Sequence, residues 1–254
     1  MNVIPLFKSH FSIGRSILTL EEPEDVENKP SSIIDLALKN DLESVFLVDD
    51  NMSGFLQAYK NCEKNNLQLN FGLRITVCPD INVKDGDSVS KSCKYIIFIK
   101  NLAGYRRLIK IYSEAAKAGF YYEPRIDFAR LAKNWDSGDL SLAVPFYDSF
   151  LHRNITSYSV CFPDFSFATP VFFIEDSNLP FDTLIQKRVE KFTEDKYQRI
   201  NSRSIYYAKR GDFKTYLTFR CINNRTVISK PNLEHMSSSG FCVETWKEQN
   251  SSIK

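Results

Sequence analysis

The chain has 254 residues, of which 43% are hydrophobic and 25% are charged, and its formal net charge is +2. This composition is that of a globular protein with enough apolar material for a core, and the near balance of charge argues against direct nucleic-acid binding as the main role. No stretch approaches the ~18 apolar residues of a membrane span, and no signal-peptide pattern follows Met1. We therefore expect a cytoplasmic protein without membrane segments.

The cysteines are scattered along the chain, and no two of them form a Cys-x-x-Cys pair. This spacing predicts free thiols and argues against a zinc site built from cysteine. The residues are Cys62, Cys78, Cys93, Cys161, Cys221 and Cys242.

Apolar runs with the composition of β-strands recur along the chain. Several are continuous rather than alternating, as is typical of strands buried on both faces. In chain order the runs are Val3–Phe7, Glu43–Val48, Leu67–Val77, Tyr95–Ile99, Leu140–Val144, Pro170–Ile174 and Arg199–Ile205.

Helical patterns lie between these runs. The clearest is Leu102–Lys117, whose apolar residues recur at spacings of three and four. The others are Ile33–Leu38 capped from Ser31-Ser32, Gly54–Asn65, Phe181–Phe192 and Asp212–Cys221.

Alternation of strand and helix implies parallel pairing through crossover connections, and hence either a barrel or a doubly wound sheet. Asp80–Ser92 is polar and aperiodic, which predicts an exposed loop. Residues 246–254 are expected to form a flexible tail.

Three groups of segments resemble the PHP domain of bacterial C-family DNA polymerases, the polymerase III alpha subunits. The most specific is Asn101–Leu108 with Gly119–Asp127, which resembles the Asn-x-x-Gly-Tyr helix and the Gly-Phe-Tyr-x-x-Pro-Arg-Ile-Asp segment of that family. Leu47–Gly54 with Phe71–Ile75 resembles an earlier part of the family pattern, a Thr-Asp-His turn followed by Asn-Met-x-Gly and then by Gly-x-Glu on the next strand. The late segments resemble the family's late strand, its final helix and its closing strand, and they are Phe172–Pro180, Asp212–Ile222 and Gly240–Val243. The resemblance implies a distorted (β/α)7 barrel over residues 1–245, followed by the tail.

An active PHP domain would hold two or three divalent metals on His, Asp and Glu side chains at strand ends, where they activate water and neutralise phosphate. The resemblance places most of those ligand positions on other residue types here. The aspartate of a Thr-Asp-His turn survives as Asp49, followed by Asp50 in place of histidine. The remaining positions are Ile4, Leu6, Lys8, Arg74, Lys94, Ser204 and Tyr206. We therefore expect no catalytic residue, no metal and no cofactor.

The substitutions introduce positive charge. Because buried carboxylates need a partner, we hypothesise that Arg74, Lys94 and Lys8 replace the metals in neutralising Asp49 and Asp50. The alternative is a divergent metal-dependent phosphoesterase or exonuclease with a rebuilt Mn or Zn site, for which Asp49, Asp50, His10 and His152 are the candidate ligands.

Arg106, Arg107 and Lys110 on the clearest helix are weak candidates for phosphate contacts, against the simpler interpretation of a solvated helix face. By resemblance, the function expected is a non-catalytic module of a replicative polymerase, which supports the polymerase body or docks a proofreading exonuclease and meets DNA only indirectly. The palm that carries polymerase chemistry in that family has no counterpart in this sequence, so we expect no DNA synthesis by this chain alone.

Overall fold

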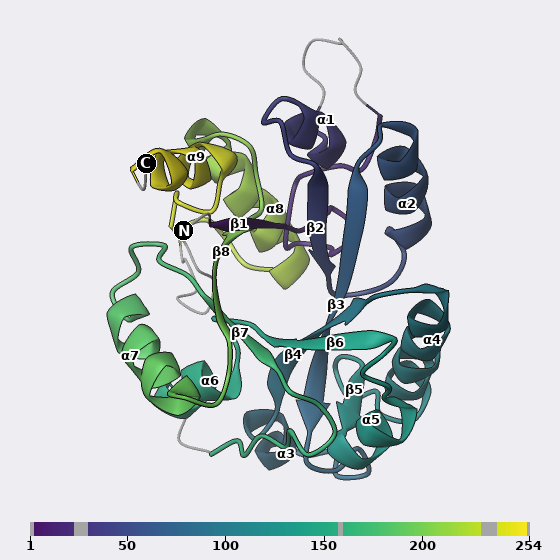
Figure 1. The fold of residues 1–254 in the computed structure, drawn as a ribbon. Coiled ribbons are helices and arrows are strands. Elements are labelled where there is room, and N and C mark those ends of the chain that lie inside the picture. Colours follow the sequence, from purple (N-terminus) through teal and green to yellow (C-terminus); the bar gives the residue numbers. More distant parts are fainter. Residues whose placement is uncertain (1–2, 23–29, 157–159, 230–237, 253–254) are drawn as a thin grey trace. The chain divides into compact units, whose positions relative to one another are not determined.

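The computed structural model describes residues 3–22, 30–156, 160–229 and 238–252. The chain divides into two compact units, which are taken in turn. Unit 1 comprises residues 1–71, 175–182 and 201–254, and unit 2 comprises residues 72–174 and 183–200. Figure 1 labels the elements of both.

Unit 1 contains three parallel strands with β1 in the middle. Leu6 of β1 is opposite Phe46 of β2 and Ser204 of β8, and α1 packs against β2 (Figure 1). The elements are β1 (Ile4–Phe7), α1 (Ile33–Leu38), β2 (Ser44–Asp49), α2 (Phe55–Lys64), β8 (Arg199–Ile205, in unit 1 from Asn201), the 3-10 helix η1 (Arg210–Asp212), α8 (Phe213–Asn224) and α9 (Val243–Ser252).

The core of unit 1 combines aliphatic residues beneath α1 with an aromatic group around β8. Ile33 and Ile34 of α1 are fully buried, and the hydroxyl of Ser32 accepts a hydrogen bond from Ile34 N at 3.2 Å, as expected of an N-cap. Tyr206 stacks on Tyr216 and Phe241, with ring centroids 5.8 and 5.2 Å away. Both apolar groups hold the strands whose ends carry the charged residues described below.

The C-terminal segment differs from the predicted tail. Residues from 246 onward continue α9 as far as Ser252, and Lys254 and Ile253 lie outside the described residues. The Trp246 side chain is 8% exposed and donates from Nε1 to the carbonyl oxygen of Val3 at 2.7 Å. Asn250 Oδ1 accepts from Val3 N at 2.9 Å. These contacts anchor α9 beside the start of β1. The sequence did not predict the helix because this segment has no long apolar run.

Unit 2 contains a mixed sheet in the order β7-β6-β4-β3-β5. The pairs β3–β4 and β4–β6 are antiparallel, whereas β3–β5 and β6–β7 are parallel. The elements are β3 (Gln68–Cys78, in unit 2 from Gly72), α3 (Gly86–Ser90), β4 (Cys93–Ile99), α4 (Leu102–Lys117), β5 (Arg125–Asp127), α5 (Phe128–Asn134), β6 (Leu140–Val144), α6 (Phe150–Thr156), β7 (Val171–Ile174) and α7 (Asp182–Thr193, in unit 2 from Thr183).

The expectation of parallel pairing throughout was therefore wrong for β4. A continuous apolar run such as Tyr95–Ile99 reports that both faces of a strand are buried, and it carries no information about strand direction. The predicted loop at Asp80–Ser92 also contains α3, which begins after Asp85, whose carboxylate accepts from Ser88 N at 2.7 Å. The short elements β5, α5 and α6 were not predicted.

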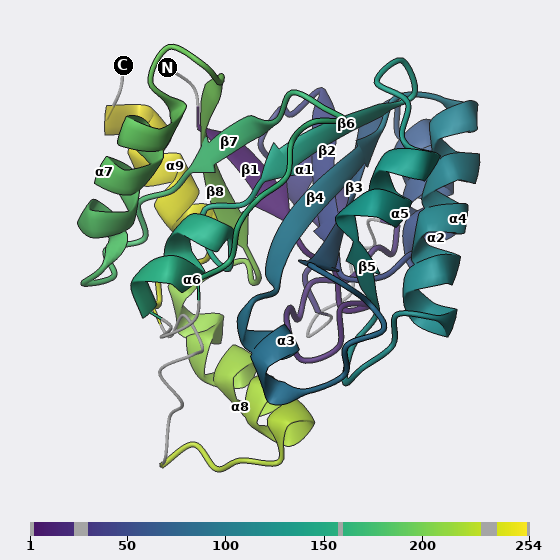
Figure 2. The ribbon, with the colours of Figure 1, turned by 90° about the horizontal axis from the view of Figure 1, so that it is seen from below.

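Helices α4 and α5 pack on one another and contact β5, as Figure 2 shows. An aromatic group fills another part of unit 2, where Phe172 of β7 meets side chains from α6 and α7. Its members are Tyr95, Phe150, Phe165, Phe172, Phe192 and Tyr197. The sheet and its helices thus give the polar residues at the strand ends a rigid base.

None of the helices in the described part of the chain has the length and apolar character needed to cross a lipid bilayer. All of the cysteines are free thiols, as predicted from their spacing.

Candidate functional site

Asp49, the last residue of β2, is fully buried. Its carboxylate accepts three hydrogen bonds from the segment that follows β1. Ser9 donates from its backbone nitrogen at 2.8 Å and from its hydroxyl at 2.6 Å, and the Ser12 hydroxyl donates at 2.8 Å. Both oxygens of the acid are therefore held by donors of the protein itself.

Burial raises the pKa of Asp49, because the charged carboxylate loses its hydration. The positive charge of Lys8 and the hydrogen bonds from Ser9 and Ser12 act in the opposite direction and reduce the increase. The three donors satisfy the lone pairs that a buried acid would otherwise leave without partners. Asp49 is thus held mainly by neutral groups.

Asp50 is paired with Lys8. The Lys8 ammonium lies 2.9 Å from Asp50 Oδ1, and the two side chains are 7% and 26% exposed. The backbone at Asp50 is fixed as well, because its nitrogen donates to the Ser12 hydroxyl at 2.9 Å. Ser12 therefore bridges the two aspartates. A buried lysine at the end of β1 occupies one of the positions that the resemblance assigned to a metal ligand.

The other predicted positions of unit 1 have non-ligand roles. Leu6 is buried and Ile4 is partly buried within β1, and Tyr206 belongs to the aromatic group near α8. Ser204 donates from its backbone nitrogen and its hydroxyl to the carboxylate of Glu175, at 2.8 Å in each case. Glu175 is buried, and burial raises its pKa against the opposing hydrogen bonds from Ser204 and the charge of Arg203.

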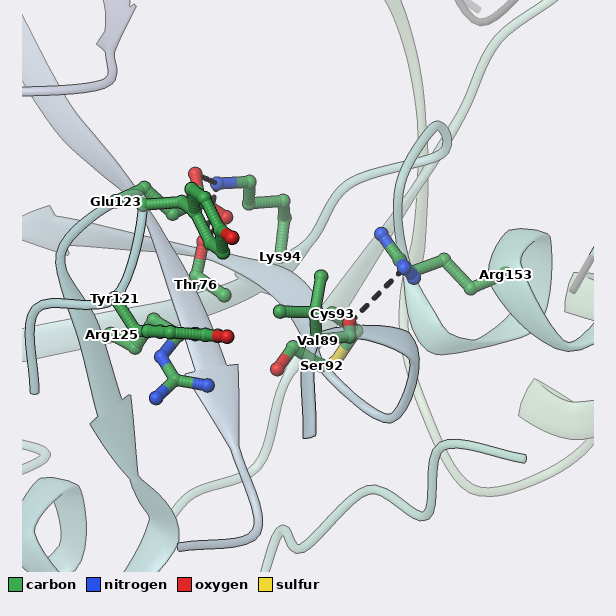
Figure 3. A pocket seen from close by; sticks show the side chains of 10 residues that line it. Thr76, Val89, Ser92, Cys93, Lys94, Tyr121, Glu123, Arg125 and Arg153 are labelled. Atoms are coloured by element: carbon green, nitrogen blue, oxygen red, sulfur yellow. Dashed lines mark hydrogen bonds and ion pairs between the residues drawn. The ribbon is translucent and has the colours of Figure 1, made fainter. Parts of the chain in front are cut away.

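In unit 2, the antiparallel register places Thr76 of β3 opposite Lys94 of β4. The Lys94 ammonium donates to the Thr76 hydroxyl and lies 2.5 Å from Glu123, which also accepts from Thr76 at 2.6 Å. Figure 3 shows Lys94 and Glu123 directed toward one another. Burial alone would raise the pKa of Glu123, but Lys94, Thr76 and Arg74 together lower it.

Arg74 pairs with Asp148 in unit 2, and the guanidinium side chain is 9% exposed. Asp148 is placed beside β4 because its carbonyl oxygen accepts from Lys94 N at 2.9 Å. The structure thus shows Arg74 and Lys94 paired with Asp148 and Glu123, two acids that the charge-replacement hypothesis did not include. Of the pairs that the hypothesis named, the structure shows Lys8 with Asp50.

The histidines proposed as alternative ligands are used locally. His10 Nδ1 lies 3.3 Å from the carbonyl oxygen of Leu18, to which a protonated Nδ1 donates. His152, in α6, accepts from Asp148 N through Nδ1 at 2.9 Å. Among the described residues, no three His, Cys, Asp or Glu side chains are grouped so that they could hold a metal ion. The side chains at Asp49 and Asp50 therefore do not fit a PHP-type metal cluster.

The weak phosphate-contact candidates lie on α4. Arg106 and Lys110 are exposed, which fits a solvated helix face. Arg107 is paired with Asp139 at 2.7 Å and with Asp136 at 3.0 Å. Arg107 therefore links α4 to the segment before β6.

The sequence analysis did not identify three acids that partner the predicted positions. Glu123 pairs with Lys94, Asp148 pairs with Arg74, and Glu175 accepts from Ser204. Glu123 lies inside the Gly119–Asp127 segment, so a signal was present, but the resemblance there concerned other residues. Asp148 was visible only as a neighbour of His152. Glu175 directly follows the last residue of β7. Its place at the end of a predicted strand was a signal that could have made it a candidate site residue.

Comparison with known proteins identifies several relatives. A family model described as PHP domain matches residues 24–150. The DNA polymerase III subunit alpha of Borreliella burgdorferi is 32% identical over 108 residues, which cover 41% of this chain and 9% of that protein. That of Chlamydia trachomatis is 32% identical over 94 residues, covering 36% and 8% respectively. The match spans less than a tenth of the length of these relatives.

Among solved structures, a metal-dependent phosphoesterase from Bifidobacterium adolescentis is 16% identical, with a TM-score of 0.24, over 45% of this chain and 35% of that one. The family match covers half of the sequence, and it confirms both the resemblance and the predicted fold class, α/β of the PHP barrel type. The chain belongs to the PHP domain family.

Proposed function

We propose that this chain is a non-catalytic PHP module of a polymerase III alpha assembly. In this role it supports the polymerase body or docks a proofreading exonuclease. The relatives named DNA polymerase III subunit alpha support the link to replication. The contacts of Asp49 and Asp50 support the absence of hydrolytic chemistry.

One observation carries the second part of the proposal. The surviving aspartate of the metal motif, Asp49, accepts three hydrogen bonds from Ser9 and Ser12, and its neighbour Asp50 is paired with buried Lys8. A divalent metal at this position would have to displace those donors and sit beside a buried ammonium. Two like charges at such short range repel strongly where little water screens them.

Lys94 strengthens this argument in unit 2. Its ammonium stands where the resemblance places a histidine ligand, and it is paired with Glu123 and hydrogen-bonded to Thr76. An ammonium has no lone pair for a metal, so this position contributes no ligand. The local chemistry favours an internal ion pair over metal-activated water.

The test is elemental analysis of the chain purified without chelator, together with thermal unfolding in the presence of Mn²⁺ and of Zn²⁺. A metal that binds the native state raises the melting temperature. We expect no stoichiometric metal and no increase. The matched control is Asp49→Asn, which removes the one retained acid. Stoichiometric metal in the wild type that is lost in Asp49→Asn would favour the alternative function, a divergent phosphoesterase.

The scaffold role needs a separate test. Affinity capture with the tagged chain, followed by mass spectrometry, is expected to recover a polymerase III subunit or a DNA exonuclease. An unrelated tagged protein of similar size is the control. Recovery of neither from a lysate that contains both would contradict the scaffold proposal, whatever the metal analysis shows.

A further inference from the structure

Helix α4 has apolar residues on two of its faces. One face belongs to the core of unit 2, where Leu108, Ile111 and Ala115 are buried. The other face, which we call the outer seam, consists of residues at alternating spacings of three and four. They are Leu102, Tyr105, Ile109, Tyr112 and Ala116. At about 100° per residue, the outer seam lies about 110° round the helix axis from the buried face.

The core does not use the outer seam. Leu102 is 64% exposed, Ile109 is 40% exposed and Ala116 is exposed as well, and Figure 1 shows α4 at the outer edge of unit 2. Single exposed apolar residues are common on protein surfaces. In α4, however, the apolar residues recur with the spacing at which one α-helix packs against another. From Leu102 to Ala116 the seam is about 21 Å long.

Helix α5 packs on a different side of α4. Glu114 accepts a hydrogen bond from Asn134 of α5 at 3.2 Å. Arg107 pairs with Asp136 and Asp139, which lie in the segment after α5. Arg107 and Glu114 are about 170° round the helix axis from the outer seam. The contacts with α5 therefore leave the outer seam exposed to a partner.

A row of cations runs beside the outer seam, about 100° round the helix axis from it. This cationic row consists of Arg106, Lys110 and Lys117, which are all exposed. Within the described part of the chain none of the three is paired with an acid, in contrast to Arg107. Water can solvate exposed cations, but cations that flank an apolar seam also select a partner with negative charge at the same place.

The shape and charge of this face favour one kind of partner. A helix that lies on a lipid surface uses a broad apolar face, whereas the outer seam is a narrow stripe. DNA phosphates would contact the cations and leave Leu102 and Ile109 without a role. A second copy of α4 would bring the same cations and no acid on this face. A helix of another protein with an acidic edge matches both features.

We propose that the outer seam of α4 docks an amphipathic helix of a partner protein, whose apolar side packs against Leu102 and Ile109 and whose acidic edge meets the cationic row. Docking of this kind uses apolar anchors at the helical spacing, and the opposite charges set the orientation and exclude other partners. This surface would serve the scaffold role proposed above, on which the inference rests.

Two synthetic peptides of about 21 residues, or three heptads, test the surface. Both have leucine at the a and d positions, and they carry either glutamate or lysine at the flanking e and g positions. The like charges also keep each peptide from pairing with itself. Each labelled peptide is titrated with the full chain, and binding is followed by fluorescence anisotropy. We expect the glutamate peptide to bind about tenfold or more tightly than the lysine peptide.

Variants locate the site. Ile109→Asp places a charge in the outer seam and should weaken binding of the glutamate peptide about tenfold or more. Arg106→Glu combined with Lys110→Glu should reverse the preference, so that the lysine peptide binds more tightly. The matched control is Lys60→Glu, at an exposed lysine on α2, which should bind as the wild type does. Thermal melts verify that each variant is folded.

Three results would overturn the proposal: no binding of the glutamate peptide at millimolar concentration, equal affinity for the two peptides, or equal affinity of the wild type and folded Ile109→Asp. Dimerisation of the wild type that Ile109→Asp abolishes would assign the seam to a second copy. Binding of duplex DNA or of phosphatidylglycerol vesicles that the double variant loses, without binding of the glutamate peptide, would assign the face to nucleic acid or lipid.

Affinity capture separates this surface from the scaffold role itself. If the wild type and folded Ile109→Asp recover a polymerase III subunit or an exonuclease in equal amounts, the docking surface is wrong and the scaffold role stands. If the glutamate peptide binds as expected but the wild type recovers neither protein, the docking surface stands and the scaffold role is contradicted.

Discussion

Each unit holds a carboxylate by different means: Asp49 at the end of β2 in unit 1, and Glu123 in the turn before β5 in unit 2. In unit 1, Asp49 is fully buried and accepts from the hydroxyls and backbone of neighbouring serines, and its pKa is raised. In unit 2, the Glu123 side chain is 47% exposed and paired with Lys94, and its pKa is lowered. The two carboxylates thus have opposite pKa shifts, because burial prevails at Asp49, whereas Lys94, Thr76 and Arg74 together outweigh burial at Glu123.

The comparison shows two ways in which the protein itself holds a carboxylate. Neutral donors can enclose it, as Ser9 and Ser12 enclose Asp49, which makes the acid structural. A lysine can pair with it, as Lys94 pairs with Glu123, which makes the pair a charged part of a pocket wall. We expect substitutions to have large effects on stability in the first case and small effects in the second.

The largest effect is expected for Asp49→Ala. It would leave the Ser9 amide and two serine hydroxyls without their acceptor, so we expect the free energy of unfolding to fall by about 3 kcal/mol or more. Urea unfolding measures the change. The control is Asp35→Ala, which breaks a 2.7 Å pair with exposed Lys39 and should cost ~0.5 kcal/mol. Equal losses in both variants would show that Asp49 is not the structural centre of the site.

A smaller effect is expected for Lys8→Met, about 2 kcal/mol, because it leaves the partly buried Asp50 without this cation. Combining it with Asp50→Asn gives a double-mutant cycle for the pair. We expect a coupling of about 1 kcal/mol between the two changes in unfolding free energy. Additive losses would mean that the 2.9 Å contact contributes nothing of its own.

The smallest effect is a pair of opposite pH dependences. Asp49 has a folded pKa above its ordinary 3.8, so its contribution to stability is full at low pH and falls as the pH rises from 3.8 toward the folded value. Glu123 has a folded pKa below its ordinary 4.5, so its contribution is full above 4.5 and is lost as the pH falls through the folded value.

Urea unfolding of the wild type, Asp49→Asn and Glu123→Gln between about pH 3 and pH 7 resolves the two signs. As the pH rises, the wild type should lose stability relative to Asp49→Asn and gain it relative to Glu123→Gln. Shifts of the same sign in both comparisons would refute the contrast between the two units.

Much of the architecture was predictable because apolar periodicity directly reports burial. All of the predicted strand runs are strands, and the predicted Leu102–Lys117 helix has the same bounds in the structure. Strand direction was not predictable, since β4 is apolar on both faces whether its neighbours run parallel or antiparallel. Short elements such as β5 were missed because three residues carry no period.

The candidate site divides in the same way. The sequence by itself determined which positions carry charge, since Lys8, Arg74 and Lys94 stand where the family resemblance places metal ligands. Only the tertiary structure decided the partners: Asp50 for Lys8, Asp148 for Arg74 and Glu123 for Lys94. The physical reason is range, because an ion pair or hydrogen bond depends on separations of a few ångströms. Residues far apart in the chain reach that separation only through strand register and packing.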